Sequence, residues 1–208
     1  TLDTLATYIF EHCLWYFMRE GGAPEITLID GDEIKALTPL YDALIPELET
    51  DTFTLEAADH HQAHFTITHI KLRRITKEHS IGLCANNRLV QEKTLKIPAL
   101  HGKLSDPQGE FIYVCHVASP YLDDHVRAER MEFDFPKEGE LYIKENQIIE
   151  AITQKATVFL EHYLENNKMK GLARVTKYIA ENSPRYQPIL CKLADETRYI
   201  DPDIKNNE

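Results

Sequence analysis

The chain has 208 residues, of which 43% are hydrophobic and 27% are charged, as in an ordinary globular protein with one large domain or two small ones. Its formal net charge of -11 at pH 7 argues against sequence-blind nucleic-acid binding, which requires a broadly basic surface, although a local basic patch remains compatible with it. The sequence has no apolar run of about eighteen residues, so no membrane-spanning helix is expected.

The first part of the chain predicts a helix followed by a short strand. Apolar residues recur every four positions in Thr1–Arg19, which predicts a helix, and Gly21-Gly22 is a typical helix end. Because the chain enters this helix directly at Thr1, we expect it to be an excised fragment. The residues that follow are expected to form a strand, a turn and a helical or irregular stretch, over Glu25–Ile29, Asp30-Gly31-Asp32 and Asp32–Leu48.

The middle of the chain is rich in β-branched and aromatic residues, often in alternation with polar ones, which predicts strands. Asn86-Asn87 is a pair that accepts positive φ, so the segments on either side of it are expected to form a hairpin. Residues Gly102–Gly109 read as a polar loop. The expected strands are Phe53–Ala57, Ala63–Arg74, His79–Ala85, Arg88–Lys96, Glu110–Ala118 and Met131–Phe135.

The last part of the chain predicts helices. One apolar stripe runs through Lys144–Asn167, Gly171 interrupts it, and a second helix is expected over Leu172–Glu181, before a polar and frayed tail. The fold class is therefore α+β, with a mostly antiparallel or mixed sheet covered by a long helix. We expect a helix-and-strand piece at 1–50, an α+β domain at 51–167, and a helical end with the polar tail at 168–208.

The segment Tyr121–Phe135, YLDDHVRAERMEFDF, is the most unusual connection in the chain. It is long, charged and free of glycine, whereas strands that pair directly are joined by short turns. Arg127 and Arg130 lie three residues apart, so in a helical conformation they share one face, and two guanidinium groups together suit an anionic partner such as a phosphate. The alternative without a binding role is a solvated loop in which Asp123, Asp124 and Glu129 form salt bridges with these arginines.

A catalytic interpretation of the same segment is a hydrolase or nucleotidyl-type enzyme. It would use the cluster of Asp123, Asp124 and His125, with a divalent cation if distant acids complete the site. The hairpin tip Asn86-Asn87-Arg88 offers a phosphate or partner contact, but turn formation explains its two asparagines equally well.

Several other residue groups are candidates for binding sites. The HHQAH segment places His60, His61 and His64 at spacings that suit zinc, although no matching Cys or His pair lies nearby and a solvated loop is the simpler interpretation. Asp30 and Asp32 are a conceivable metal pair, and a strand-ending turn explains them more simply.

The basic residues Lys71, Arg73, Arg74 and Lys77 cluster on or near one strand and are a candidate DNA-binding patch, with a solvated strand edge as the alternative.

The cysteines Cys13, Cys84, Cys115 and Cys191 are scattered among apolar neighbours and form no CxxC pair. We read Cys84 and Cys115 as core residues and expect a reducing, cytoplasmic setting without disulfides.

The order of these segments is similar to that of a known family. The hairpin GLCANNRLVQEKTL resembles the "cavNgR.V" hairpin of the second domain of MutL-type proteins. The stretch FIYVCHVASPYLDDHVRAERMEFDF resembles the strand, basic loop and returning segment of that domain. Residues Thr1–Ile29 resemble the last helix and strand of the Bergerat-type ATPase domain, which is shared by the GHKL group that includes MutL, gyrase B, histidine kinases and the heat-shock chaperone of ninety kilodaltons.

The resemblance implies a fold and a role. The expected fold for 51–167 is the transducer fold, which is like the second domain of a small-subunit ribosomal protein. In this family a basic residue of the second domain reaches the γ-phosphate of ATP held by the first, which implies this role for Arg130, or for Arg127. Implied partners are an upstream ATPase domain, a second copy of the chain in a homodimer, and DNA. A chaperone-like ATPase segment is the alternative to a mismatch-repair-like one.

Departures from the family limit what is implied. The MutL segment NVHPAK is missing, and so are the nucleotide motifs, a helix with Glu and Asn one turn apart, an Asp-x-Gly-x-Gly turn and a Gly-rich lid. Asp30-Gly31-Asp32 is the only candidate for that turn, and it lacks the second glycine. ATP and Mg²⁺ are therefore expected to bind outside these residues, and the fragment alone is expected to be inactive.

Overall fold

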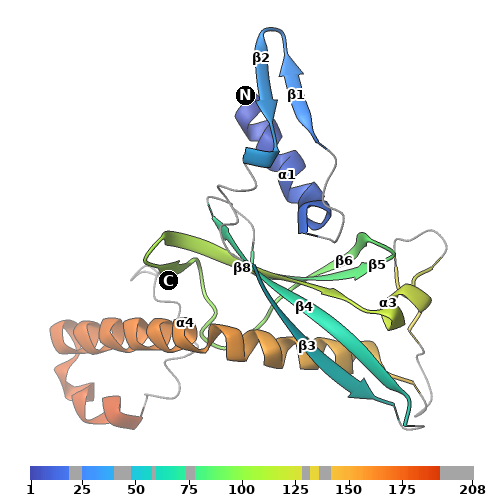
Figure 1. The fold of residues 1–208 in the computed structure, drawn as a ribbon. Coiled ribbons are helices and arrows are strands. Elements are labelled where there is room, and N and C mark those ends of the chain that lie inside the picture. Colours follow the sequence, from blue (N-terminus) through green and yellow to red (C-terminus); the bar gives the residue numbers. More distant parts are fainter. Residues whose placement is uncertain are drawn as a thin grey trace.

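The computed structural model describes residues 1–18, 25–39, 48–57, 60–73, 78–127, 132–135 and 142–192. Its main body is a six-stranded mixed sheet that lies between two helices, and a separate two-stranded hairpin stands beside the first helix (Figure 1). The chain is therefore α+β, as the sequence predicted. The elements in chain order are α1 Leu2–Met18, β1 Thr27–Asp30, β2 Glu33–Ala36, β3 Leu48–Glu56, β4 Gln62–Arg73, β5 Ser80–Ala85, β6 Arg88–Thr94, β7 Leu104–Asp106, β8 Gly109–Ala118, α3 Pro120–Asp124, α4 Glu145–Asn182 and the 3₁₀ helix η1 Pro184–Lys192.

The strand order of the large sheet is β3-β4-β8-β5-β6, and the short β7 pairs with β8. The pairing of β5 with β8 is parallel, whereas the other pairings in this sheet are antiparallel. Gly82 lies opposite His116 in the parallel pair, and a Cβ atom at Gly82 would lie 2.5 Å from Cδ2 of His116. The side chain of His116 therefore occupies the space that a side chain at position 82 would need.

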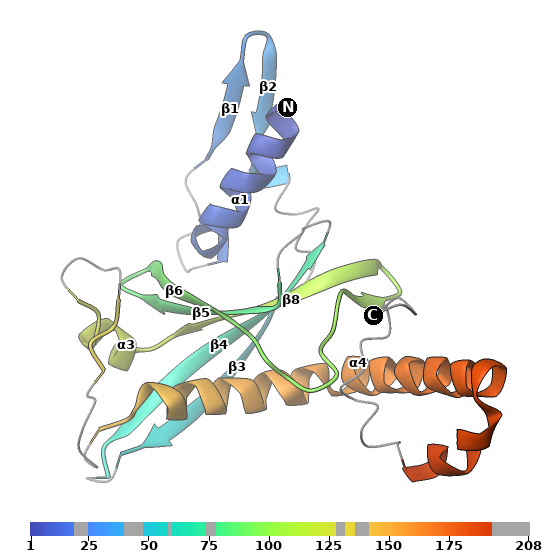
Figure 2. The ribbon, with the colours of Figure 1, turned by 180° about the vertical axis from the view of Figure 1, so that it is seen from behind.

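Helix α4 covers one face of the sheet. Its residues Ile148, Ile152, Ala156 and Leu160 repeat every four positions and are fully buried, because they pack on the main core of the sheet. Figures 1 and 2 show α4 and α1 on opposite sides of the sheet.

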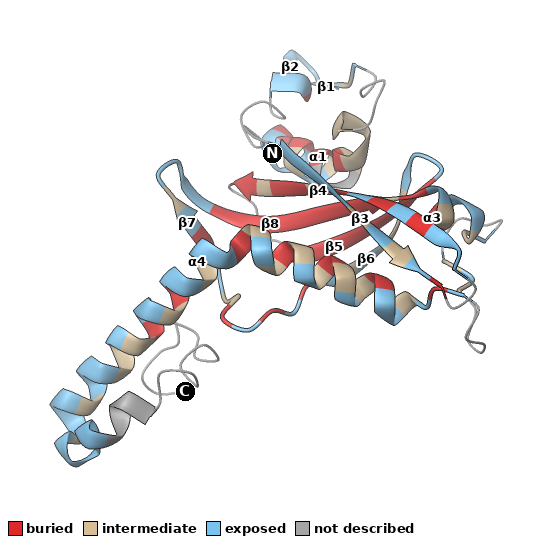
Figure 3. Cartoon of the chain, turned by 60° about the horizontal axis from the view of Figure 1, so that its bottom comes forward, coloured by how far each residue is buried: buried red, intermediate tan, exposed pale blue. Residues whose placement is uncertain are grey.

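Helix α1 covers part of the other face. Phe10 and Leu14 pack against β4 and β8 in a second, smaller core. Strands β4 and β8 are thus buried on both faces over part of their length, which explains why the β8 sequence FIYVCHVA is a continuous apolar run and does not alternate. Figure 3 shows this buried centre of the sheet in red.

The Asn86-Asn87 hairpin is confirmed. These two residues have φ values of 49° and 62° and join β5 to β6, as a turn with two positive φ angles requires. Cys84 and Cys115 are both fully buried, as predicted, and burial raises the pKa of both thiols, so neither is a reactive nucleophile.

The predicted interruption at Gly171 was wrong. Helix α4 runs through this glycine without a break, and Gly171 is itself buried. One turn earlier, the Asn167 side chain donates hydrogen bonds to the carbonyl oxygens of Ala99 and His101, at 3.2 and 3.5 Å. The packing of this loop on the helix offsets the roughly 1 kcal/mol that glycine costs a helix relative to alanine.

Three further predictions need correction. Glu33–Ala36, expected to be helical or irregular, is strand β2, paired with β1. The predicted polar loop Gly102–Gly109 contains strand β7, because Leu104 is buried in the main core and aligns its neighbours with β8. Of the predicted strand Met131–Phe135, the described residues make only an isolated bridge, between Val126 and Phe133.

None of the helices in the described ranges is both long enough and apolar enough to cross a bilayer. The division into 1–50, 51–167 and 168–208 and the cytoplasmic setting stay predictions.

Candidate functional site: the loop after strand β8

The charged loop begins with a fixed helix start. Strand β8 ends next to Ser119, whose hydroxyl donates a hydrogen bond to the carbonyl oxygen of His64 on β4 at 2.7 Å and accepts one from the amide of Tyr121 at 3.1 Å. Ser119 is therefore an N-cap, and Pro120 occupies the first helical position, where its missing N–H costs nothing. The buried side chain of Leu122 then joins α3 to the main core.

Tyr121 and His125 connect the loop to the lead-in of α4. The Tyr121 hydroxyl donates to the carbonyl oxygen of Ile143 at 2.8 Å. The Nδ1 atom of His125 lies 2.8 Å from the carbonyl oxygen of Tyr121, so Nδ1 carries the proton, since a carbonyl oxygen only accepts. The two rings stack with their centroids 4.1 Å apart, and this stack fixes the direction of the chain as it leaves α3.

Asp123 binds the tip of the β5–β6 hairpin. Its Oδ1 atom accepts a hydrogen bond from the amide of Asn86 at 2.6 Å. This contact satisfies a backbone donor in the turn and ties α3 to a second part of the sheet. Of the predicted hydrolase cluster, Asp123 is directed to the turn, whereas Asp124 and His125 line one hollow, and the catalytic interpretation stays a prediction.

Arg127 is held by acidic neighbours of the same loop. Its guanidinium lies 3.2 Å from the Glu132 carboxylate and 3.6 Å from that of Asp134, and the backbone of Arg127 donates to the carbonyl oxygen of Glu132. Arg127 is thus salt-bridged within the loop, as the alternative without a binding role predicted. Its partners are Glu132 and Asp134 and not Asp123 or Asp124. Arg130 and Glu129 lie outside the described residues.

The segment that returns from this loop packs through aromatic rings. Phe133 and Phe135 stack with centroids 5.1 Å apart, and the ring of Phe135 lies 6.3 Å from that of His125. Both phenylalanines pack against the main core. Together with Tyr121 they join the charged loop to the body of the protein by apolar contact as well as by hydrogen bonds.

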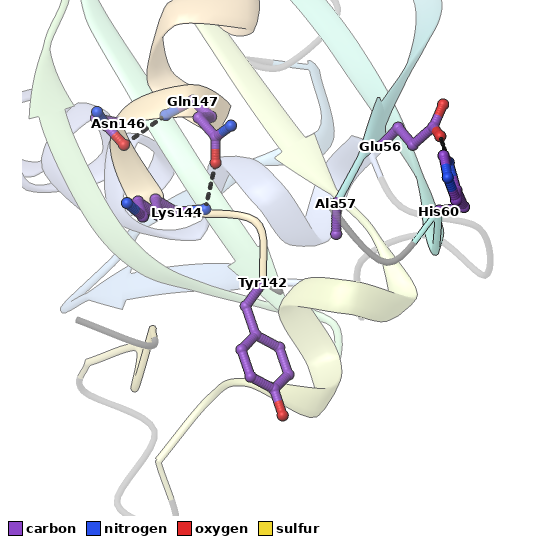
Figure 4. Close-up of a pocket in the computed structure, with 7 residues that line it drawn as sticks. All are labelled: Glu56, Ala57, His60, Tyr142, Lys144, Asn146 and Gln147. Carbon is purple, nitrogen blue, oxygen red and sulfur yellow. Dashed lines mark hydrogen bonds and ion pairs between the residues drawn. The ribbon is translucent and has the colours of Figure 1, made fainter. Parts of the chain in front are cut away.

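Two neighbouring hollows lie beside the residues that lead into α4, and the smaller one adjoins the charged loop. The larger, of about 630 Å³, lies between the β3–β4 connection and the start of α4 (Figure 4). Figure 4 shows Glu56 and His60 together on one side and the residues of the helix start on the other. The smaller, of about 290 Å³, is lined in part by α3 and shares Ala57 and Tyr142 with the larger one.

The predicted zinc residues are dispersed. Nδ1 of His60 lies 2.6 Å from Oε1 of Glu56, and Nδ1 of His64 lies 2.9 Å from the Thr54 hydroxyl. His61 lines the smaller hollow. Within the described ranges, no group of three His, Cys, Asp or Glu side chains is arranged to hold a metal ion, and this includes the turn of Asp30 and Asp32.

The predicted basic patch is only partly exposed. Arg73 is buried and forms a two-pronged ion pair with Asp106, with N···O distances of 3.0 and 2.7 Å. The ammonium group of Lys71 lies 5.5 Å from the ring centroid of Tyr163 on α4. Arg74 and Lys77 are outside the described residues. DNA binding stays a prediction. The guanidinium of Arg73 is paired with Asp106 and is not free to contact a phosphate.

From the sequence, Tyr121 was included in this segment without a role, and Ser119 and Tyr142 were not identified as parts of the region. The pattern Ser-Pro before a charged segment is a helix-start signal and could have identified the N-cap. The contacts of the two tyrosines join segments that are far apart in the sequence, and no local pattern reveals them.

Comparisons of this chain with family models, with curated proteins and with solved structures gave no match. Its function is therefore argued from the geometry of the loop.

Proposed function

We propose that this chain is the coupling segment of a MutL-like ATPase of the GHKL group. In this proposal, ATP binds in a domain that precedes the chain, and the chain converts nucleotide binding into domain movement or dimerisation. The mixed sheet with a long helix across one face supports the transducer fold that the resemblance implies for this segment.

The observation that carries the proposal is the anchoring of the charged loop to three separate elements. Ser119 ties it to β4, Asp123 ties it to the β5–β6 turn, and Tyr121 ties it to the residues that precede α4. A displacement of a loop fixed in this way has to move the sheet end and the helix start with it, since packed elements transmit strain. A solvated connection without a coupling role needs no such attachments.

Arg130 is the better candidate for the γ-phosphate contact. Arg127 already has two carboxylate partners, so its use by a phosphate would cost those ion pairs. Arg130 follows within the four residues that separate Arg127 from Glu132 in the sequence.

The described residues do not fit the binding of ATP and Mg²⁺ by this chain alone. The Asp30-Gly31-Asp32 turn leads into strand β2, not into a glycine-rich lid, and the described carboxylates form no metal-binding group. No step of ATP hydrolysis is therefore assigned to them.

The first test is calorimetric titration of this chain with Mg²⁺ and ATP. Binding no tighter than the millimolar range is expected, and micromolar binding by the isolated chain would overturn the proposal.

The second test uses the protein that includes the preceding ATPase domain. Arg130→Ala should lower kcat for ATP hydrolysis about 10-fold or more and leave the Kd for ATP within about threefold, because the charge acts mainly in the transition state. Arg185→Ala, a charge removal on η1, is the matched control. An unchanged kcat in the Arg130 variant would remove this residue from the mechanism.

A further inference from the structure

The smaller hollow beside α3 brings together residues from three separate parts of the chain. It has a volume of about 290 Å³. The turn that precedes β4 contributes His61, α3 and the residue after it contribute Asp124 and His125, and the lead-in of α4 contributes Tyr142. Two unusual motifs of the sequence, HHQAH and YLDDH, therefore meet at one concave site.

The walls of this hollow are largely aromatic and apolar. Tyr121, Tyr142 and His125 are among the lining residues, and the stack of His125 on Tyr121 covers one face of each of these two rings. The apolar residues Ala57, Ala63 and Ile143 and the polar Gln62 also line it. Hollows of this kind, apolar with a few convergent polar groups, are the usual form of a ligand site.

One carboxylate gives the hollow its charge. Asp124 lines it, and no other side chain in the described ranges forms a hydrogen bond or ion pair with this carboxylate. Its neighbour Asp123, in contrast, is engaged by the amide of Asn86 at 2.6 Å. Among the described residues that line it there is no lysine or arginine, whereas the larger hollow has both Lys144 and Glu56 in its wall.

We propose that this hollow is a binding site for a small organic ammonium ion. Aromatic faces attract a cation through their quadrupole, and a carboxylate at the same site adds a direct ion pair. The described part of the wall offers a carboxylate and no lysine or arginine, which favours a cation over an anion. The three candidate metal ligands, His61, Asp124 and His125, are not arranged to chelate, which favours an organic cation over a metal ion.

The site adjoins the contacts that carry the proposed ATPase role, because Tyr121 and Ile143 also line the hollow, but it uses a different carboxylate. Those contacts are made by Ser119, by the carboxylate of Asp123 and by the hydroxyl of Tyr121, and none of them would be broken by a ligand at Asp124. Choline binding and ATP hydrolysis are measured separately, so failure of this proposal would be distinguishable from failure of the proposed function.

Choline and 3,3-dimethylbutan-1-ol provide a direct test, because they have the same shape and differ in charge. Titration of this chain at pH 8, above the ordinary pKa of histidine, would be followed by heteronuclear NMR. We expect saturable shifts with choline for residues that line the hollow, with a Kd on the order of 1 mM, and binding at least about tenfold weaker for the neutral alcohol.

Two variants and two controls locate the site. Asp124→Asn and Tyr142→Ala should each raise the Kd for choline about fivefold or more. Tyr142 is 53% exposed, so its removal should leave the fold intact, and the dispersion of the NMR spectrum checks this. Asp32→Asn and Tyr178→Ala make the same chemical changes away from the hollow and should leave the Kd unchanged.

Equal binding of the neutral alcohol would overturn the proposal, as would choline shifts that both site variants leave unchanged. The absence of saturable shifts at concentrations well above the millimolar range would also overturn it.

Discussion

The hydroxyl of Tyr113 on β8 lies 2.6 Å from Nδ1 of His69 on β4. Burial raises the pKa of Tyr113, so the phenol keeps its proton, and burial lowers the pKa of His69 to about 4, so its imidazole is neutral at pH 7. The two groups therefore share a hydrogen bond as a neutral phenol and a neutral imidazole. Helix α4 also contacts this pair, because the ring of Phe159 on α4 stacks on the ring of His69 with centroids 4.2 Å apart.

Stability should fall in mild acid because of this histidine. The pKa of about 4 in the folded protein lies below the ordinary histidine pKa of about 6.5, so the unfolded chain binds the proton first as the pH falls. The contribution of His69 is complete above about pH 6.5 and is lost progressively down to about pH 4, for a total on the order of 3 kcal/mol. Two charged groups that face the ring have smaller effects on the pKa of His69. The carboxylate of Asp51 raises it and the ammonium group of Lys155 lowers it.

The measurement is urea unfolding between pH 4 and 7. His69→Gln keeps an acceptor for Tyr113 but cannot gain a proton, so it should flatten the pH dependence, while His64→Gln, at an exposed position of β4, should not. His79 has the same direction of shift, through burial, and accounts for the slope that remains. If the free energy of unfolding depended equally on pH in the wild type and in the His69 variant, the Tyr113–His69 pair would not be responsible for the loss of stability in acid.

Removal of Asp106 should be among the most destabilising single changes. Its carboxylate forms the two-pronged pair with Arg73, and the two side chains are only 8% and 10% exposed, respectively. Asp106→Ala leaves the guanidinium buried without its partner, at a cost of about 3–5 kcal/mol in the free energy of unfolding. Glu132→Ala breaks an exposed pair with Arg127 and should cost less than about 1 kcal/mol. Similar costs for both variants would contradict the assignment.

The side chain of Asn167 should stabilise the long helix against the loop before β7. Asn167→Ala leaves two carbonyl oxygens without their donor in a region of low exposure, and we expect a loss of about 1–3 kcal/mol. Asn166→Ala is the matched control, because this exposed neighbour bonds only within the helix, to His162, and should cost less than about 0.5 kcal/mol. Thermal unfolding of the two variants makes the comparison.

The contact between Asp123 and Asn86 should control the order of the hairpin tip. Asp123→Ala should raise the hydrogen-exchange rate of the Asn86 amide about tenfold or more, because a hydrogen bond to a charged acceptor is worth about 1.5–3 kcal/mol. The neighbouring change Asp124→Ala removes the same charge without this bond and should leave that rate unchanged. Equal rates in both variants would show that the contact does not hold the turn in solution.

Much of the fold could be predicted where a pattern is long and local. The turn at Asn86-Asn87, the strand at Glu110–Ala118 and the stripe from Ile148 to Leu160 were all identified correctly, because residue type and period agree there. Strand β7 was missed because three residues are too few to show alternation, and it is specified by its pairing with β8. Continuation through Gly171 was missed because distant carbonyl groups determine it.

The candidate site was predictable only in part. The charge and length of Tyr121–Phe135 identified the loop, but the partners of its residues are set by tertiary contacts. Asp123, for example, has one distant partner in Asn86, while the adjacent Asp124 faces a hollow. Two neighbouring aspartates with such different surroundings are indistinguishable in a sequence.

Helix α4 has a mechanical consequence. It has 38 residues, so at 1.5 Å per residue it is about 57 Å long, yet its deeply buried apolar stripe ends at Leu160 and its second half extends away from the sheet in Figure 3. The start of this rod is tied to the charged loop through Ile143. If a displacement of the loop tilted the helix by roughly 5° about that end, the far end would move by about 5 Å, so the proposed coupling role would be magnified over the length of α4.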